Sequence, residues 1–138
     1  MPDFKNLTVG DVVAEKEYQL TRDSLVRYAG ASGDFNTIHY RDDIAQAVGL
    51  PGVLAHGMLT MGISVQPVVE WVGDAAKVVD YGVRFTKPVV VPPQGFAQIS
   101  VKATVGTLDE ENQKARIDLT TAFDQNTVLG KAQVWVQF

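Results

Sequence analysis

The stretch from Gly52 to Trp71 is apolar on nearly every side, and it limits the possible folds more than any other segment. A helix over this stretch would have no polar face to turn toward water, so we expect it to be buried. Pro67 removes one backbone donor within the stretch, and a kink or a change of pitch is expected near it. The rest of the chain must therefore cover a long buried helix.

Beyond Ala75 the chain changes to runs of β-branched and aromatic residues that partly alternate with polar ones. Turn-forming residues separate these runs. With a further strand from Val12 to Leu20, the pattern predicts an α+β fold: an antiparallel sheet of about five strands around the helix. The four later strands are expected over Val78 to Phe85, Phe96 to Val105, Ala115 to Phe123 and Val128 to Phe138.

Two short helices are expected before the apolar stretch. Thr21 is a suitable N-cap for a helix over Arg22 to Ala31, and a second helix from about Arg41 to Val48 is stopped by Gly49. The chain has 138 residues, 46% of them hydrophobic, and it contains no repeat or charged linker. It is therefore expected to form a single domain over residues 1–138.

Composition argues against several classes of function. The chain has no cysteine and two histidines, which leaves few ligands for a metal centre. Its net charge is −4 and its basic residues are dispersed, so no basic stripe is available for nucleic acid. The first residues do not form a leader peptide, and no apolar run approaches the roughly 20 residues that span a bilayer. We expect a cytoplasmic protein without a metal, a nucleic-acid partner or a membrane span.

Asp34 and His39 lie in an irregular segment between the two short predicted helices. Gly33, Asp34 and Asn36 favour turns, so a carboxylate and an imidazole can converge on one small volume. Such a pair can polarise water and transfer protons, because the ordinary pKa of histidine is about 6.5. On spacing alone, the pair also fits a turn carboxylate and a structural histidine. Asn36 likewise has two interpretations: it braces a catalytic loop, or it only closes an Asx-turn.

Gly57 lies near the start of the apolar stretch, within Ala55-His56-Gly57-Met58-Leu59. The first N–H groups of a helix have no partner in the helix and lie at its positive end. Without a side chain, Gly57 can offer its N–H to a carbonyl oxygen, as in an oxyanion hole. Alternatively, this glycine only permits close packing. His56 is interpreted as a helix cap or a helix-end contact, without a catalytic role.

The run from Tyr28 to His39, followed by Ala45, resembles the hydratase motif of the MaoC-like (R)-specific enoyl-CoA hydratases and the related (3R)-hydroxyacyl-ACP dehydratases. Gly49 to Gly62 and Val83 to Val89 are also similar to that family, so the likeness covers almost the whole chain. This resemblance implies a hot-dog fold, in which an antiparallel sheet wraps around a long buried helix.

The same resemblance implies a hydro-lyase that reversibly dehydrates (3R)-hydroxyacyl thioesters to trans-2-enoyl thioesters, in fatty acid or mycolic acid elongation. Asp34 and His39 match the family's catalytic dyad, and the Gly57 N–H matches its oxyanion donor. Asn36 is expected to support the catalytic loop. The implied substrate is an acyl-CoA or an acyl-ACP, and no cofactor beyond that thioester carrier is expected.

Leu20-Thr21-Arg22 and Trp71-Val72-Gly73-Asp74 look like the catalytic B subunit of the two-subunit (3R)-hydroxyacyl-ACP dehydratase of actinobacteria. This likeness implies a heterodimer with a related hot-dog subunit that lacks a competent dyad. A homodimer is the alternative, because many relatives are homodimers. An open sheet edge also favours pairing with a second protomer.

The chain departs from the family's pattern in three places, one of which is Val91-Pro92-Pro93-Gln94-Gly95, where many members have a Gly-Asp turn. Thr37 replaces the motif's proline, which is expected to loosen the loop, and Val65 replaces a serine of some hydratases, so Ser64 is left out of the site. A hot-dog acyl-CoA thioesterase is the nearest rival function, but it needs a carboxylate close to the helix start. Glu70 is roughly 20 Å from Gly57 at about 1.5 Å per residue. A non-catalytic acyl-thioester-binding subunit is the third possibility.

Overall fold

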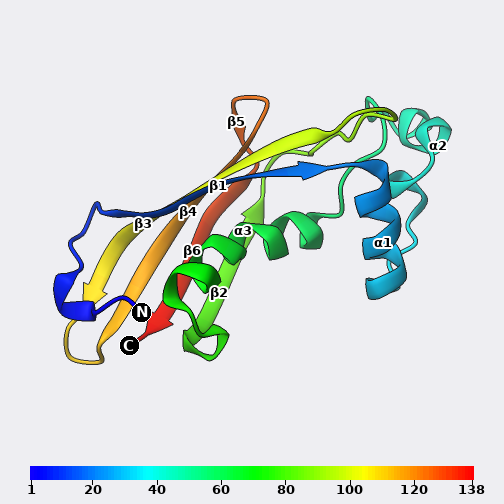
Figure 1. The fold of residues 1–138 in the computed structure, drawn as a ribbon. Coiled ribbons are helices and arrows are strands. Elements are labelled where there is room, and N and C mark those ends of the chain that lie inside the picture. The colour runs from blue at the N-terminus through cyan, green and yellow to red at the C-terminus, as the bar shows by residue number, and fades with distance from the viewer.

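Five long strands form one antiparallel sheet, and a long helix, α3, lies against one face of it (Figure 1). The computed structural model describes residues 1–138. The strand order is β1-β3-β4-β6-β2, so β1 and β2 form the two edges. The strands are β1 (Val12–Leu20), β2 (Val78–Phe85), β3 (Ala97–Asp109), β4 (Lys114–Phe123), β6 (Leu129–Gln137) and the short β5 (Asn126–Thr127), which pairs with β4.

Two shorter helices, α1 (Arg22–Ser32) and α2 (Asp42–Ala47), lie beyond one end of the sheet (Figure 1). The two chain termini lie close together at the opposite end (Figure 1). The long helix α3 covers Gly57–Val72. None of the helices is both long and apolar enough to cross a membrane.

The predicted α+β arrangement, an antiparallel sheet with a long helix on it, is confirmed. β1 and β2 have the predicted bounds, and Thr21 caps α1 by accepting a hydrogen bond from Ser24 N at 3.3 Å. The predicted third strand was too short, because β3 continues past Val105 to Asp109. A register irregularity between Val105 and Thr107 interrupts the alternation there, and this hides the end of the strand from pattern reasoning.

The predicted start of the long helix is wrong. α3 begins at Gly57, because the residues from Gly52 onward are extended and pair with a distant segment. Ala55 N donates to Val89 O at 2.8 Å, and Val91 N donates to Val53 O at 2.9 Å. Toward its C-terminus the helix continues through Pro67 without a break in its assignment, so the expected kink stays a prediction.

The prediction that α3 is buried on every side is also wrong. The helix buries only one face, and Met58 on the other side is 58% exposed. Two hydroxyls on the buried face bond within the core: Ser64 Oγ donates to Thr60 O at 2.7 Å, and Thr121 Oγ1 donates to Ser64 Oγ at 3.0 Å. The exposed face of α3 is apolar at Met58 and polar further along, at Gln66 and Glu70. The buried residues of the helix are Thr60, Ser64, Pro67, Val68 and Val72.

Arg22, at the start of α1, forms hydrogen bonds with two other segments, the one that contains Val91 and helix α2. Its Nε donates to Val91 O at 2.8 Å, and its two terminal nitrogens donate to the Asp42 carboxylate at 3.0 and 2.8 Å. Asp42 Oδ1 also accepts a hydrogen bond from Val53 N at 3.2 Å. The hydrogen bond with Arg22 is the main reason that the pKa of Asp42 lies below its ordinary value. One side chain thus connects α1, α2 and both paired segments.

Arg22→Ala is expected to destabilise this connection, because it leaves Val91 O and the Asp42 carboxylate without their charged donor. The urea midpoint should fall, and the amide of Val53 should exchange faster with deuterium. Arg27→Ala on the same helix is the matched control, since Arg27 is exposed and should leave both measurements near wild type. Equal effects of the two substitutions would contradict this role of Arg22.

Candidate active site

The segment between α1 and α2 is held by its own polar side chains. Gly33 ends α1 in the left-handed conformation, with φ 76°. Asp34 Oδ1 then accepts a hydrogen bond from Asn36 N at 3.1 Å, and Asn36 Oδ1 accepts one from Ile38 N at 3.2 Å. Asn36 thereby closes an Asx-turn and caps the 3₁₀ turn Thr37–His39. The carboxylate and the imidazole are brought to neighbouring positions by local bonds.

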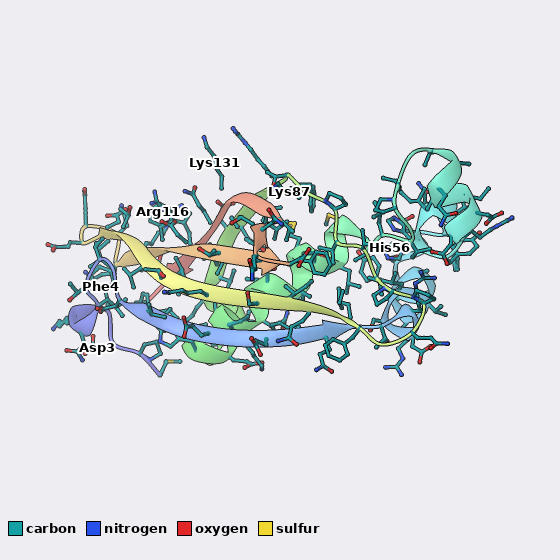
Figure 2. The ribbon with its side chains drawn as sticks, turned by 90° about the horizontal axis from the view of Figure 1, so that it is seen from above. Asp3, Phe4, His56, Lys87, Arg116 and Lys131 are labelled. Carbon is teal, nitrogen blue, oxygen red and sulfur yellow. The ribbon has the colours of Figure 1, made fainter.

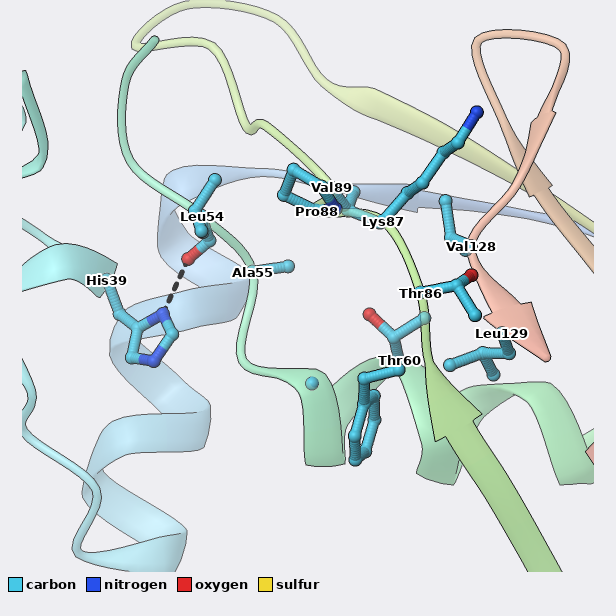
Figure 3. A pocket seen from close by; sticks show the side chains of 12 residues that line it. His39, Leu54, Ala55, Thr60, Thr86, Lys87, Pro88, Val89, Val128 and Leu129 are labelled. Atoms are coloured by element: carbon cyan, nitrogen blue, oxygen red, sulfur yellow. Dashed lines mark hydrogen bonds between the residues drawn. The ribbon is translucent and has the colours of Figure 1, made fainter. Parts of the chain in front are cut away.

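His39 has a defined tautomer. Its Nδ1 lies 2.7 Å from Leu54 O (Figure 3). A carbonyl oxygen only accepts, so Nδ1 carries the hydrogen, and Nε2 of the neutral ring keeps a free lone pair. That Nε2 lies 4.0 Å from Asp34 Oδ2. This separation is too long for a direct hydrogen bond. A third polar group, such as a water molecule, can therefore bridge the two side chains.

His39 and Gly57 line the same cavity, whose volume is about 300 Å³. Its opposite wall is largely apolar and includes Val89, Val128 and Leu129 (Figure 3). Lys87 belongs to the lining, but its ammonium extends away from His39 (Figure 3). The cavity therefore places an imidazole and a helix N-terminus beside an apolar surface.

Gly57 is the first residue of α3, and its N–H has no acceptor within the chain. A Cβ at this position would lie 3.0 Å from Cε1 of the Phe85 ring, so a side chain here would require that ring to shift. The N–H points from the positive end of a helix that carries no acidic residue in its first turn. A carbonyl oxygen in the cavity would meet an unoccupied donor.

His56 precedes Gly57 and is 1% exposed. It occupies the N-cap position of α3 but makes no side-chain capping bond, so the interpretation as a cap is wrong. Its ring instead faces the segment between α1 and α2, where α3 meets the two short helices (Figure 2). His56 Nε2 lies 3.1 Å from Asp34 O, and its ring stacks on His39 with 3.9 Å between centroids.

The side chains of Asp34, His39 and His56 approach one another, with ligand-type atoms all within 4.8 Å. Their arrangement does not suit a shared metal ion. The two imidazole planes are stacked at 23°, whereas ring nitrogens bind metals through lone pairs that lie in the ring plane. His39 Nδ1 and His56 Nε2 are also engaged by carbonyl oxygens.

Burial lowers the pKa of His56 below its ordinary value of 6.5. As pH falls through that value, the unfolded chain takes up a proton at this residue and the folded chain does not. The free energy of unfolding is therefore expected to decline from about pH 6.5 toward the lower pKa of folded His56. Urea titrations across this range test the effect, with His56→Gln expected to reduce the slope. A slope unchanged in that variant would contradict it.

The structure brings together three of the four residues predicted for the site. Asp34 lies beside His39, and His39 shares its cavity with Gly57; Asn36 supports the turn from outside the cavity. Sequence reasoning missed Thr60 and the far wall of the cavity, which come from distant parts of the chain. No local pattern could have identified them. Sequence reasoning also left His56 out of the site. Its position next to Gly57, as a histidine within an apolar segment, was a signal that could have identified it.

Comparison with known proteins gives a consistent picture. Residues 3–122 match the family model described as "MaoC like domain". A curated relative, "3-hydroxyacyl-thioester dehydratase X" of Mycobacterium tuberculosis, is 38% identical over 74 residues, which are 54% of this chain and 25% of the relative. The chain thus spans about a quarter of that protein.

Two solved structures are similar over nearly the whole chain. One, titled "MaoC-like dehydratase", has a TM-score of 0.95 and 36% identity, and the match covers 99% of this chain and 42% of the other. The ChsH1-ChsH2 complex from Mycobacterium tuberculosis contains a chain with a TM-score of 0.81 and 18% identity, covered to 98%, against 95% of this chain. At that identity the second likeness concerns the fold alone.

Proposed function

Because the chain belongs to the MaoC-like domain family, we propose that it is a hydro-lyase that interconverts (3R)-hydroxyacyl and trans-2-enoyl thioesters. The observation that carries this proposal is the free Nε2 of His39, 4.0 Å from the Asp34 carboxylate and on the same cavity as the Gly57 N–H. Relatives named as dehydratases support it. The reaction uses the substrate's thioester carrier, CoA or acyl carrier protein, and no further cofactor.

In the hydration direction, a water molecule lies between His39 Nε2 and Asp34 Oδ2. The pair withdraws a proton as the water oxygen bonds to the β-carbon, and a proton is delivered to the α-carbon. The Gly57 N–H donates to the thioester oxygen while the substrate has enolate character. In dehydration the same groups act in reverse, and water leaves. The acyl chain contacts the apolar wall formed by Val89, Val128 and Leu129.

Two parallel assays test this function. Hydration removes the ultraviolet absorbance of an enoyl thioester, whereas hydrolysis releases a free thiol that a thiol reagent detects. We expect absorbance loss without thiol release, using CoA and acyl-carrier-protein substrates of graded chain length. Thiol release would support a thioesterase. No absorbance loss and no thiol release would support a non-catalytic binding subunit. Activity after treatment with a metal chelator would support the absence of a metal requirement.

We further propose that the working unit is a dimer, with a related hot-dog subunit as the partner. The exposed face of α3 around Met58 and the edge strand β2 offer a continuous surface for it, because Tyr81 of β2 bonds to Met61 O of α3 at 2.7 Å. The name of one similar structure, the ChsH1-ChsH2 complex, supports assembly with a second subunit. A partner that covers this face would complete the acyl cavity.

Light scattering and activity measured on one sample test the assembly. Weak activity of the chain expressed alone, restored by a co-expressed paralogue, is the expected result. A stable and fully active homodimer would contradict the heterodimer. The cytoplasmic location expected from the sequence is also part of the proposal, and cell fractionation followed by immunodetection tests it.

A further inference from the structure

His56 is the one histidine, lysine, arginine or acidic side chain that is buried in this structure. Burial of a polar group is unfavourable unless its hydrogen-bonding atoms find partners. His56 Nδ1 is buried and has no partner. A residue with the same volume and no polar atoms would avoid that cost. The fold therefore retains an imidazole where packing alone does not require one.

The contacts of His56 explain what the imidazole does. Asp34 O only accepts hydrogen bonds, so His56 Nε2 carries the hydrogen and donates to it at 3.1 Å. On one face the ring stacks on His39, with 3.9 Å between centroids and 23° between planes. Tyr28 of α1 meets the His56 ring edge-on, at 4.7 Å and 61°. One side chain thus contacts the backbone of Asp34 and the ring of His39.

We propose that His56 is a positioning residue that sets the separation between Asp34 and His39. The inference rests on the proposed hydro-lyase function. The N–H of His56 fixes the backbone that carries the carboxylate, while its ring face limits how far His39 can tilt. His39 is held at its other nitrogen by Leu54 O, so the stack and this bond together fix the direction of Nε2. The imidazole supplies both the donor and the flat face in one side chain.

Two substitutions separate these contributions. Glutamine at this position, His56→Gln, keeps an N–H donor and loses the flat ring; His56→Phe keeps a flat ring and loses the donor. Each is expected to lower kcat by about 10- to 100-fold, as an ångström-scale displacement of reacting groups does. KM should change little, because His56 does not line the substrate cavity. Tyr18→Phe is the control, since it removes another buried polar atom without a partner, on β1.

A spectroscopic measurement reports the stack without any substrate. The chain has two histidines, so the imidazole region of its NMR spectrum contains two sets of ring signals. In wild type, the neighbouring ring current should displace the His39 ring protons from their free positions. The displacement should persist in His56→Phe and disappear in His56→Gln. Dispersed amide signals establish in the same samples that each variant is folded.

The outcomes distinguish the two levels of the argument. A folded wild type without hydratase activity, both alone and with the co-expressed paralogue, would overturn the proposed function. An active wild type, with a folded His56→Gln or His56→Phe variant that keeps kcat within about twofold, would overturn the positioning role alone. A loss confined to KM, or His39 ring signals that do not move in His56→Gln, would overturn it as well. Loss of kcat in both folded variants, with an unaffected Tyr18→Phe, supports it.

Discussion

Asp34→Asn and His39→Ala are each expected to lower hydratase kcat by about 10²–10⁴-fold, or roughly 3–5 kcal/mol of activation free energy, with the fold intact. Asparagine has the shape of the carboxylate but cannot accept the proton, and alanine removes the free Nε2. The Asp34 side chain is 50% exposed, and its hydrogen bond with Asn36 N supports a local turn. Neither substitution should therefore unfold the sheet.

Turnover of an enoyl thioester and circular dichroism, measured on the same preparations, check this expectation. Asp43→Asn is the matched control, because Asp43 is an exposed carboxylate on neighbouring α2 that pairs with Arg41. It should retain near wild-type kcat. If a folded Asp34→Asn or His39→Ala protein kept near wild-type turnover, the assignment of the dyad would be wrong.

Gly57→Pro should lower kcat by about 10²–10³-fold, the usual effect of losing one oxyanion donor. Proline lacks an N–H, yet it is favoured at the first position of a helix. The preceding residue, His56, already has φ −59° and ψ 130°, the extended conformation that a residue before proline prefers. The substitution therefore removes the donor with little strain on the backbone.

Gly57→Ala separates the donor from steric effects. Alanine keeps the N–H but places a Cβ 3.0 Å from the Phe85 ring, which is 56% exposed and has room to shift. Its kcat should fall much less than that of Gly57→Pro. Steady-state kinetics on both variants compare the two losses. Equal losses would mean that the glycine serves packing, and the Gly57 N–H would then have no role as an oxyanion donor.

Local patterns in the sequence predicted the elements well where neighbouring residues decide the conformation. The strand Val78–Phe85 and the cap at Thr21 were predicted from local residues, and both are confirmed. The start of α3 is decided by bonds between residues 53–55 and 89–91, which no local pattern contains. The prediction that α3 is buried on every side failed for a similar reason. Ser64 can face the core because Thr121, on the distant strand β4, donates a hydrogen bond to its hydroxyl.

The motif located Asp34 and His39, but it did not determine how they are arranged. The direction of the His39 ring depends on Leu54 O and on His56, both beyond α2 in the chain. His56 was left out because its surroundings are non-local. A histidine before a helix looks like a cap, and only the folded chain brings it against Asp34 O. The chemistry of single residues was thus more predictable than their mutual geometry.

The two sides of the cavity come from separate parts of the chain. The proposed reactive side is built by the loop between α1 and α2 and by the start of α3. Thr86, Val128 and Leu129 of the wall instead belong to the ends of β2 and β6 and the residues beside them. Substitutions in the wall can therefore change which acyl groups fit while the proton-transfer groups stay in place. Natural variation or laboratory evolution at these positions can therefore change the selectivity for acyl groups without changing the residues proposed to carry out the reaction.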